Sequence, residues 1–124
     1  MNNYQEQIKK FTEERNWGQF HNPKDLLLGL VEEVGEFRNI VKWVNDEESI
    51  KKAITENKDD VKDAIGDMFW FLASLANVCN VDIDEAIEMT IEDNTKRYPV
   101  EITKGHHTNI RLGGYDGKYK KEGE

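Results

Sequence analysis

The stretch LLLGLVEEVGEFRNIVKWV, residues 26–44, decides the fold because its apolar residues recur with the period of an α-helix. At about 100° of rotation per residue, Glu33 points within about 60° of the apolar stripe. The stripe consists of Leu26, Leu30, Phe37, Ile40 and Val44. A carboxylate in apolar surroundings is costly unless a cation compensates it, and this helix carries no lysine or arginine at a matching offset. Glu33 is therefore predicted to face the core, with Glu36 bordering the same stripe one turn later.

A second acidic cluster precedes another apolar run. Asp60, Asp63 and Asp67 follow an i, i+3, i+7 spacing directly before the apolar residues 68–72. Two helices can thus offer carboxylates to a common point between them, and oxygen ligands of this kind suit Mg²⁺ or Mn²⁺. The alternative interpretation of these carboxylates is a buried, charge-paired network that holds no metal.

The composition limits the class of protein. With 124 residues and a net charge of −8, the chain is long enough for one domain and lacks the basic patches of proteins that bind nucleic-acid polymers or anionic membranes. The polar start at residues 1–6 is no signal peptide, and no apolar run reaches the length of a membrane span. The single cysteine, Cys79, excludes an intrachain disulfide and is expected to pack against apolar neighbours. These features predict a cytoplasmic protein.

The pattern of elements predicts an all-α fold. Pro23 and Pro99 lie at segment edges, and almost no strand signal stands between them. The expected helices form a bundle of four to five and cover residues 3–16, 23–44, 46–55 (a weak pattern), 59–79 and 82–97. We expect one domain at residues 1–100, followed by a Gly- and Lys-rich tail at 101–124 that is loop-like unless a partner orders it.

The fourth expected helix carries an apolar face with clear periodicity. Val61, Ile65, Met68, Leu72 and Leu75 share this face. From Met68 to Ala76 the helix is apolar nearly all round, which is typical of a helix at the centre of a bundle or at a subunit interface.

Three aromatic residues, Trp17, Trp43 and Phe71, allow two interpretations. They fit an ordinary core, and they also suit a nucleotide pocket, because bases stack on aromatic rings. Trp43 falls on the Glu36 side of its expected helix, which favours the second interpretation. His21, beside the aromatic loop that begins at Trp17, is a candidate base contact.

A polar group ends the last expected helix. Asn94, Lys96 and Arg97 stand there, and the two cations either complement the helix dipole or contact phosphates.

Taken together, four motifs resemble those of the MazG-like all-α nucleoside triphosphate pyrophosphohydrolases, most closely the dCTP pyrophosphatase branch. The resemblance extends over about residues 5 to 100. Its motifs are FTEERNWGQFH at 11–21, LLLGLVEEVGEF at 26–37 and on to Trp43, the pair Gly66-Asp67, and DNTKRYPV at 93–100.

The resemblance implies Mg²⁺-dependent cleavage of nucleoside triphosphates to a monophosphate and pyrophosphate. In that family a Glu-x-x-Glu on one helix and a Glu-x-x-Asp on the next hold the metal. Glu33 and Glu36 match the first element and Asp67 matches the end of the second. The glutamate of the second element falls on Ala64, so Asp63, at i, i+4 from Asp67, becomes the expected substitute.

The resemblance also implies a substrate site and an assembly. Glu33 or Glu36 would orient or deprotonate the attacking water. A dimer or dimer of dimers would complete the site, with a pyrimidine such as dCTP as substrate and nucleotide pool cleansing as the role. The residues that would contact the substrate are Trp17, His21, Trp43, Phe71, Asn94, Lys96 and Arg97. Two alternatives stay open: a nucleotide- and metal-binding regulatory module without hydrolysis, and a helical oligomeric partner protein.

Overall fold

The computed structural model describes residues 3–106, and every regular element in that range is helical, which confirms the all-α class. The chain divides into two compact units, residues 1–83 and 84–124. The elements are α1 (Asn3–Glu14), a 3₁₀ turn (Trp17–Phe20), α2 (Pro23–Val41), α3 (Glu47–Glu56), α4 (Lys58–Val78), α5 (Ile83–Arg97) and α6 (Val100–Thr103).

The start of α2 follows directly from the sequence. The backbone N–H of Asp25 donates to Oδ1 of Asn22 at 2.9 Å, and Pro23 occupies the first turn, where its missing N–H costs nothing. The end of α2 differs from the expectation. The helix stops at Val41, so Trp43 lies in the following turn rather than on the helix.

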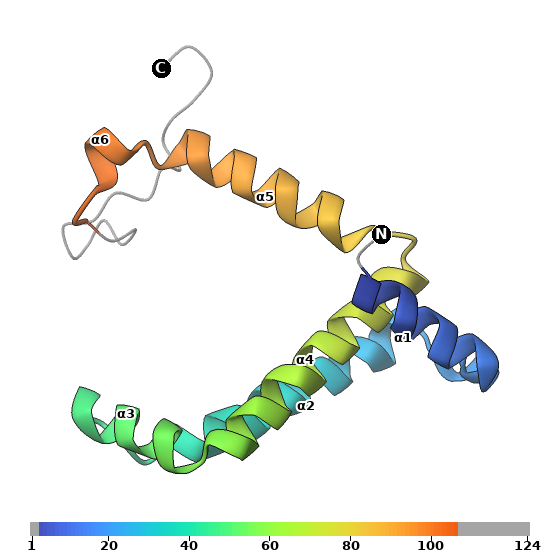
Figure 1. The fold of residues 1–124 in the computed structure, drawn as a ribbon, viewed down its shortest axis with the longest axis horizontal. Helices are drawn as coiled ribbons and strands as arrows, with labels where there is room; N and C mark the ends of the chain where they lie inside the picture. Colours follow the sequence, from blue (N-terminus) through green and yellow to red (C-terminus); the bar gives the residue numbers. More distant parts are fainter. Residues whose placement is uncertain (1–2, 107–124) are drawn as a thin grey trace. The chain divides into compact units, whose positions relative to one another are not determined.

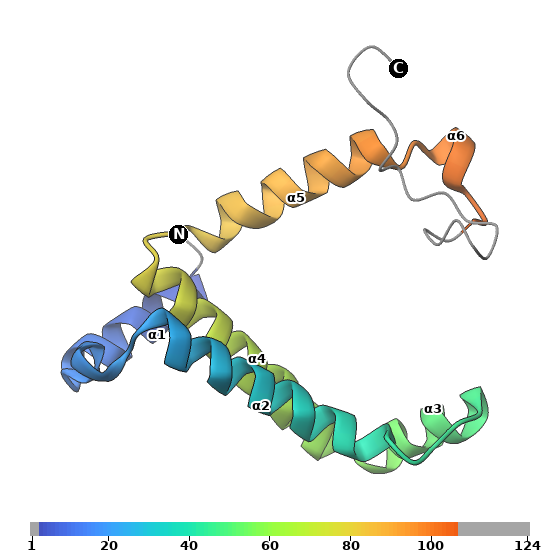
Figure 2. The same cartoon turned by 180° about the vertical axis from the view of Figure 1, so that it is seen from behind.

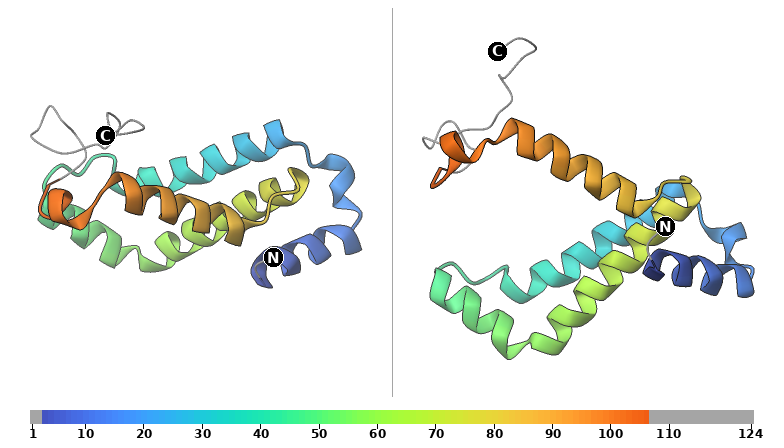
Figure 3. Two further views of the ribbon diagram at one scale, coloured as in Figure 1. Left: turned by 90° about the horizontal axis from the view of Figure 1, so that it is seen from above. Right: turned by 45° about the horizontal axis from the view of Figure 1, so that its top comes forward.

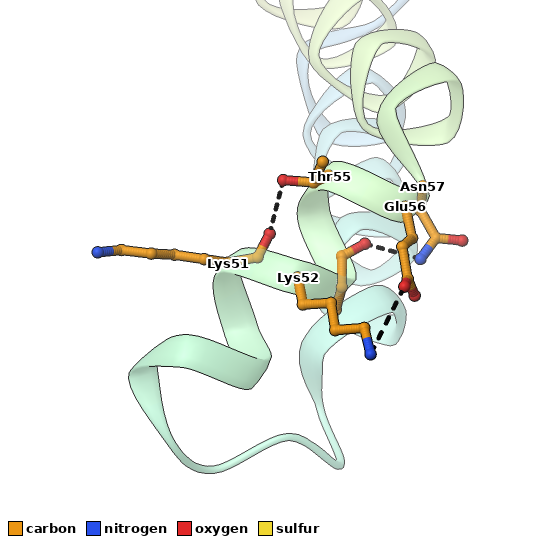
Figure 4. A network of polar contacts seen from close by, with 6 residues as sticks. Lys51, Lys52, Thr55, Glu56 and Asn57 are labelled. Carbon is orange, nitrogen blue, oxygen red and sulfur yellow. Dashed lines mark hydrogen bonds and ion pairs between the residues drawn. The ribbon is translucent and has the colours of Figure 1, made fainter.

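Local polar contacts fix both ends of α3. Ser49 N–H caps onto Asp46 Oδ2 at 2.9 Å, and this hydrogen bond lowers the pKa of Asp46. At the other end of α3, Asn57 donates from its side chain to the carbonyl of Ala53 at 2.7 Å, and Lys52 pairs with Glu56 at 3.9 Å (Figure 4). The chain therefore turns at Asn57 and continues at once as α4.

The antiparallel pair of α2 and α4 is the centre of the first unit. The two helices lie side by side along their length in both Figure 1 and Figure 2. Their contacts set the register: Gly29 lies opposite Phe71, and Ile40 lines one cleft with Asp60 and Ala64. This register places the second half of α2 against the first half of α4.

A buried glutamine fastens α1 to the end of α4. The side chain of Gln5 is fully buried and donates from Nε2 to Asn77 Oδ1 at 3.0 Å and to the carbonyl of Val81 at 2.8 Å. Its Oε1 accepts from the backbone N–H of Ile83 at 3.0 Å. Such a side chain is tolerated in the interior because its polar atoms have partners.

The buried core of the first unit is small. Its fully buried apolar residues are Ile8, Leu26, Val61, Ala64, Ala73 and Ala76. The predicted apolar face of α4 is mostly not part of this core, because Ile65 is 53% exposed and Leu72 is 45% exposed. On α2 a second apolar face is exposed, formed by Leu27, Val31 and Val34. Among residues 3–106 the face expected from the periodicity of α4 is therefore only partly buried, with Val61 in the core and Ile65 and Leu72 exposed.

The remaining expectations concern the chain ends. The second unit carries α5, a single helix in both views of Figure 3, and α6, a short helix at the start of the segment that the sequence assigned to the tail. The tail from residue 107 on lies outside the described residues, so the division at residue 100 stays a prediction.

Cys79 is exposed, and its expected packing was wrong. No single helix within residues 3–106 is long and apolar enough to cross a membrane, although α4 and α5 as a bent pair satisfy that test by length and composition.

Candidate active site

Glu33, in the middle of α2, faces α4 as the sequence predicted. Burial raises the pKa of its carboxyl above the ordinary value of 4.5, and the charges of Asp67, Glu36, Glu32 and Asp63 raise it further. All four of these neighbours are negatively charged. The helix pair therefore gathers carboxylates from both helices around Glu33.

One oxygen of Glu33 lacks any partner. Its Oε2 is buried and accepts no hydrogen bond from the described residues. A buried carboxylate oxygen without a donor is unfavourable, so it indicates a missing cation or donor at this point. The charge-paired network that competed with a metal site would require a cation beside Glu33, and among residues 3–106 the charges that act on Glu33 belong to carboxylates.

The acidic site continues toward the C-terminal end of α2 as an open cleft. Its volume is about 240 Å³. Its lining residues are Glu36, Asn39 and Ile40 of α2 with Asp60, Asp63 and Ala64 of α4. The side chains of Glu36, Asp60 and Asp63 are exposed at its mouth, whereas Ala64 is only 4% exposed at its floor.

The Ala64 position is the point where this chain departs from the expected motif. Ala64 does face the cleft opposite Glu36, so a glutamate there would contribute an oxygen, which the methyl group cannot. Two other aspartates, Asp60 and Asp63, line the same cleft. Asp63 is among the charges that raise the pKa of Glu33 and Asp60 is not, which makes Asp63 the better substitute.

The residues fit a hard divalent cation by chemistry. Carboxylate oxygens are the ligands that Mg²⁺ and Mn²⁺ prefer, and the unpartnered Oε2 of Glu33 is a ligand atom without another role. Within residues 3–106, no three His, Cys, Asp or Glu side chains are arranged closely enough to enclose an ion. The carboxylates thus form an open site, in which Mg²⁺ would complete its coordination with water and substrate oxygens.

The two candidate tryptophans lie at opposite ends of α2. Trp17 follows α1, where its ring meets Phe11 edge-on at 5.5 Å, and Phe11 in turn meets Trp70 at 5.1 Å. Trp43 follows the C-terminus of α2 and is 83% exposed, with Lys42 Nζ 5.3 Å from its ring centre. The 19 residues of α2 between them span about 28 Å at 1.5 Å per residue. One base therefore cannot stack between Trp17 and Trp43 of the same chain.

Phe71 packs against α2 rather than into open space. An added Cβ on Gly29 would lie 2.7 Å from ring atoms Cδ1 and Cζ of Phe71 and closer still to Cε1, so the ring lies directly on the backbone at Gly29. Gly29 and Phe71 each lie one turn from the carboxylates of Glu33 and Asp67. Phe71 thus covers one end of the acidic site.

The other candidate substrate contacts lie apart from the cleft or in the second unit. His21 is half-buried before α2 and lines a separate cavity of about 160 Å³ with Ser74 and Asn77. On α5, Lys96 pairs with Glu92 at 3.0 Å and Arg97 pairs with Asp93 at 3.5 Å, each one turn back. Asn94 is exposed on the same helix.

Two residues at the site, Asn39 and Gly29, were not predicted from the sequence, whereas Asp60 was named there with the second acidic cluster. Asn39 and Asp60 line the cleft because they lie one turn from Glu36 and Asp63 on faces that meet across the helix pair. Gly29 supports Phe71. The role of Gly29 has no signal in the sequence, because it depends on the residue that lies opposite on α4.

The sequence is similar to a known protein family and to individual proteins of known activity. The sequence profile of the MazG-like family matches residues 33–111. The chain is 37% identical over 97 residues to dCTP pyrophosphatase 1 of Bos taurus and 33% identical over 96 residues to that of Homo sapiens. The alignments cover 77% of this chain in both cases, with 57% of the bovine and 56% of the human protein. The chain thus spans little more than half the length of these relatives.

A solved structure shows a related fold. The crystal structure of a pyrophosphatase from Archaeoglobus fulgidus superposes with a TM-score of 0.71 at 26% sequence identity. The superposition covers 76% of this chain and 87% of the archaeal one. The helical arrangement described above is therefore found in another protein.

Proposed function

Because the chain belongs to the MazG-like family, we propose that it hydrolyses nucleoside triphosphates between the α and β phosphates, in the cytoplasm, giving a monophosphate and pyrophosphate. The observation that carries this proposal is the unpartnered oxygen of Glu33, which lies in an acidic site shared by α2 and α4. The names of the bovine, human and archaeal proteins support the same reaction class.

The mechanism assigns a role to each carboxylate. Glu33, Glu36, Asp63 and Asp67 would hold Mg²⁺ or Mn²⁺, which supplies charge neutralisation for the triphosphate and a lowered pKa for water in the site. Glu33 or Glu36 would orient the attacking water and accept its proton. Little covalent chemistry is then required of the chain.

We propose a pyrimidine deoxynucleoside triphosphate, such as dCTP, as substrate and nucleotide pool cleansing as the role. The similarity to the bovine and human dCTP pyrophosphatase 1 supports dCTP. In this proposal Asn94, Lys96 and Arg97 contact the sugar and phosphates. A screen of pyrophosphate release across dCTP, dUTP, dTTP, dATP and dGTP with Mg²⁺ tests the function. Release from none of them would contradict the reaction, and a purine preference would contradict the base.

Trp43 is positioned to stack on the base, since it is exposed beyond the Glu36 end of α2. Loss of a stacking partner costs about 1 to 3 kcal/mol, so Trp43→Ala is expected to raise KM by about one to two orders of magnitude with little change in kcat. Trp43→Phe keeps a ring and serves as the control, with an intermediate KM. Steady-state kinetics of both variants test whether the base stacks on Trp43. An unchanged KM in Trp43→Ala would show that Trp43 does not contact the base.

We further propose that the chain works as a dimer or dimer of dimers. Two observations support this: the apolar faces of α2 and α4 that one chain leaves exposed, and the separation of Trp17 from Trp43. In a dimer, Trp17 and His21 of one chain can approach the Trp43 of another. Analytical ultracentrifugation is expected to give two or four times the mass of one chain. A monomer with full activity would contradict the shared site.

A second candidate function is supported by one observation. Ala64 removes a carboxylate from the floor of the cleft, which leaves fewer ligands than the family motif provides. A chain that binds nucleotide and metal for regulation, without hydrolysis, would tolerate this loss. Nucleotide binding by calorimetry without pyrophosphate release would favour this module over the enzyme.

A further inference from the structure

Among the helical glycines of the first unit, Gly29 is the one with a close neighbour. A Cβ built at Gly35 or Gly66 meets nothing within 4 Å, whereas one at Gly29 overlaps the ring of Phe71. A glycine inside a helix costs roughly 1 kcal/mol relative to alanine. At Gly29 the structure gives a reason to accept that cost, because the ring occupies the space that a side chain would take.

The position of this contact gives it a consequence for the acidic site. Glu33 lies one turn after Gly29 on α2, and Asp67 lies one turn before Phe71 on α4, so the two levels are adjacent along the antiparallel pair. Asp67 is the largest single charge effect on Glu33. Because both helices are rigid over one turn, a change in the separation of α2 and α4 at Gly29 also changes the spacing between Glu33 and Asp67.

We infer that Gly29 is a positioning residue: the missing side chain lets the Phe71 ring lie on the α2 backbone, and this contact sets the spacing between Glu33 and Asp67. An alanine at this position forces one of two responses. The helices separate, which moves the two carboxylates apart, or the ring leaves its place, which opens the end of the site. Either response disturbs the geometry around Glu33. The inference rests on the proposed function for its metal-binding consequence, but the contact itself does not.

The test uses alanine substitutions at two glycines of the same helix. Gly29→Ala is expected to lower the melting temperature of the metal-free protein and to weaken Mn²⁺ binding by about tenfold, the lower end of the loss caused by disturbing the support of a metal site. Gly35→Ala is the matched control. It makes the same change where nothing is close, so it is expected to raise the melting temperature and leave Mn²⁺ affinity unchanged.

A double variant separates the contact from a general helix effect. In a Phe71→Ala background the ring is absent, so adding Gly29→Ala is expected to raise the melting temperature instead of lowering it. Calorimetric melts of the parent, the three single variants and the double variant give the melting temperatures. Isothermal titrations of the same proteins with Mn²⁺ give the metal affinities.

The outcomes are distinct. If Gly29→Ala melts at or above the parent temperature, or lowers the melting temperature equally in both backgrounds, the positioning role of Gly29 is overturned. If Gly29→Ala melts lower but binds Mn²⁺ as tightly as the parent, the contact exists and does not set the carboxylate spacing, which also overturns the inference. If the unmodified chain itself binds no Mn²⁺ in the presence or absence of nucleotide, the proposed function fails and the inferred control of a metal site fails with it, whereas the packing contact is still read from the melting temperatures.

Discussion

The Glu33→Gln variant is expected to lose hydrolysis by about 10²- to 10⁴-fold, the range that a positioned acid or base contributes, while its metal-free form becomes more stable at neutral pH. The loss follows from removing a carboxylate whose buried Oε2 accepts no hydrogen bond from residues 3–106. The gain in stability follows because the amide carries no charge beside Asp67, Glu36 and Asp63. Pyrophosphate assays and thermal melts in a chelator measure the two effects.

The pH dependence of that stability gain has a definite sign. The folded-state pKa of Glu33 is raised above 4.5, so the folded protein holds the proton more tightly than the unfolded chain does. At a pH below the pKa of Glu33 in the unfolded chain, the carboxyl is protonated in both states and does not weaken the fold. As the pH rises through the pKa in the folded state, the carboxyl ionises and lowers the free energy of unfolding. The advantage of Glu33→Gln should appear at neutral pH and vanish at a pH below about 4.

A neighbouring residue provides the control for Glu33→Gln. Glu32→Gln makes the same exchange one position earlier, on an exposed side chain. It is expected to retain most activity and to change the melting temperature little. Equal losses in both variants would mean that total charge, and not the position of Glu33, controls the reaction. Full activity in Glu33→Gln would reject the metal site.

The inward direction of Glu33 could be predicted because helical periodicity needs only local sequence. The start of α2 at Pro23 was predictable for the same reason, since Asn22 and Pro23 act within one turn. The end of α2 was not. The apolar pattern continues through Val44, but the helix stops at Val41, which moved Trp43 from a helix face to an exposed turn.

Contacts between helices were beyond the reach of periodicity. The periodicity of α4 placed Val61, Ile65 and Leu72 on one face, but a repeat along one helix does not say which surface covers that face. In the structure Val61 is buried, whereas Ile65 and Leu72 are exposed. The pairing of Gly29 with Phe71 depends on the antiparallel register, which only the folded helix pair defines. The same register brought Asp60 into the cleft.

Substituting Asp63 and Asp60 in turn is expected to show which of the two aspartates replaces the glutamate that the family motif has at Ala64. Asp63→Asn should weaken Mg²⁺ binding by at least about tenfold, since even residues that only support metal ligands contribute that much. Asp60→Asn should change Mg²⁺ affinity little. Both variants lose one charge from exposed positions on the same helix, so each is a matched control for the other.

The reason for the difference lies in the position of each aspartate along α4. Asp63 contributes to the raised pKa of Glu33 and stands at i, i+4 from Asp67, whereas Asp60 is not among the charges that raise it and lines only the outer cleft with Glu36. An ion bound near Glu33 and Asp67 can therefore reach Asp63 first. Calorimetric Mg²⁺ titrations with a non-hydrolysable nucleotide analogue distinguish the cases. Small effects in both variants would mean that Glu33, Glu36 and Asp67 suffice as ligands, and a large effect of Asp60→Asn alone would place the ion in the outer cleft, one turn farther from Glu33.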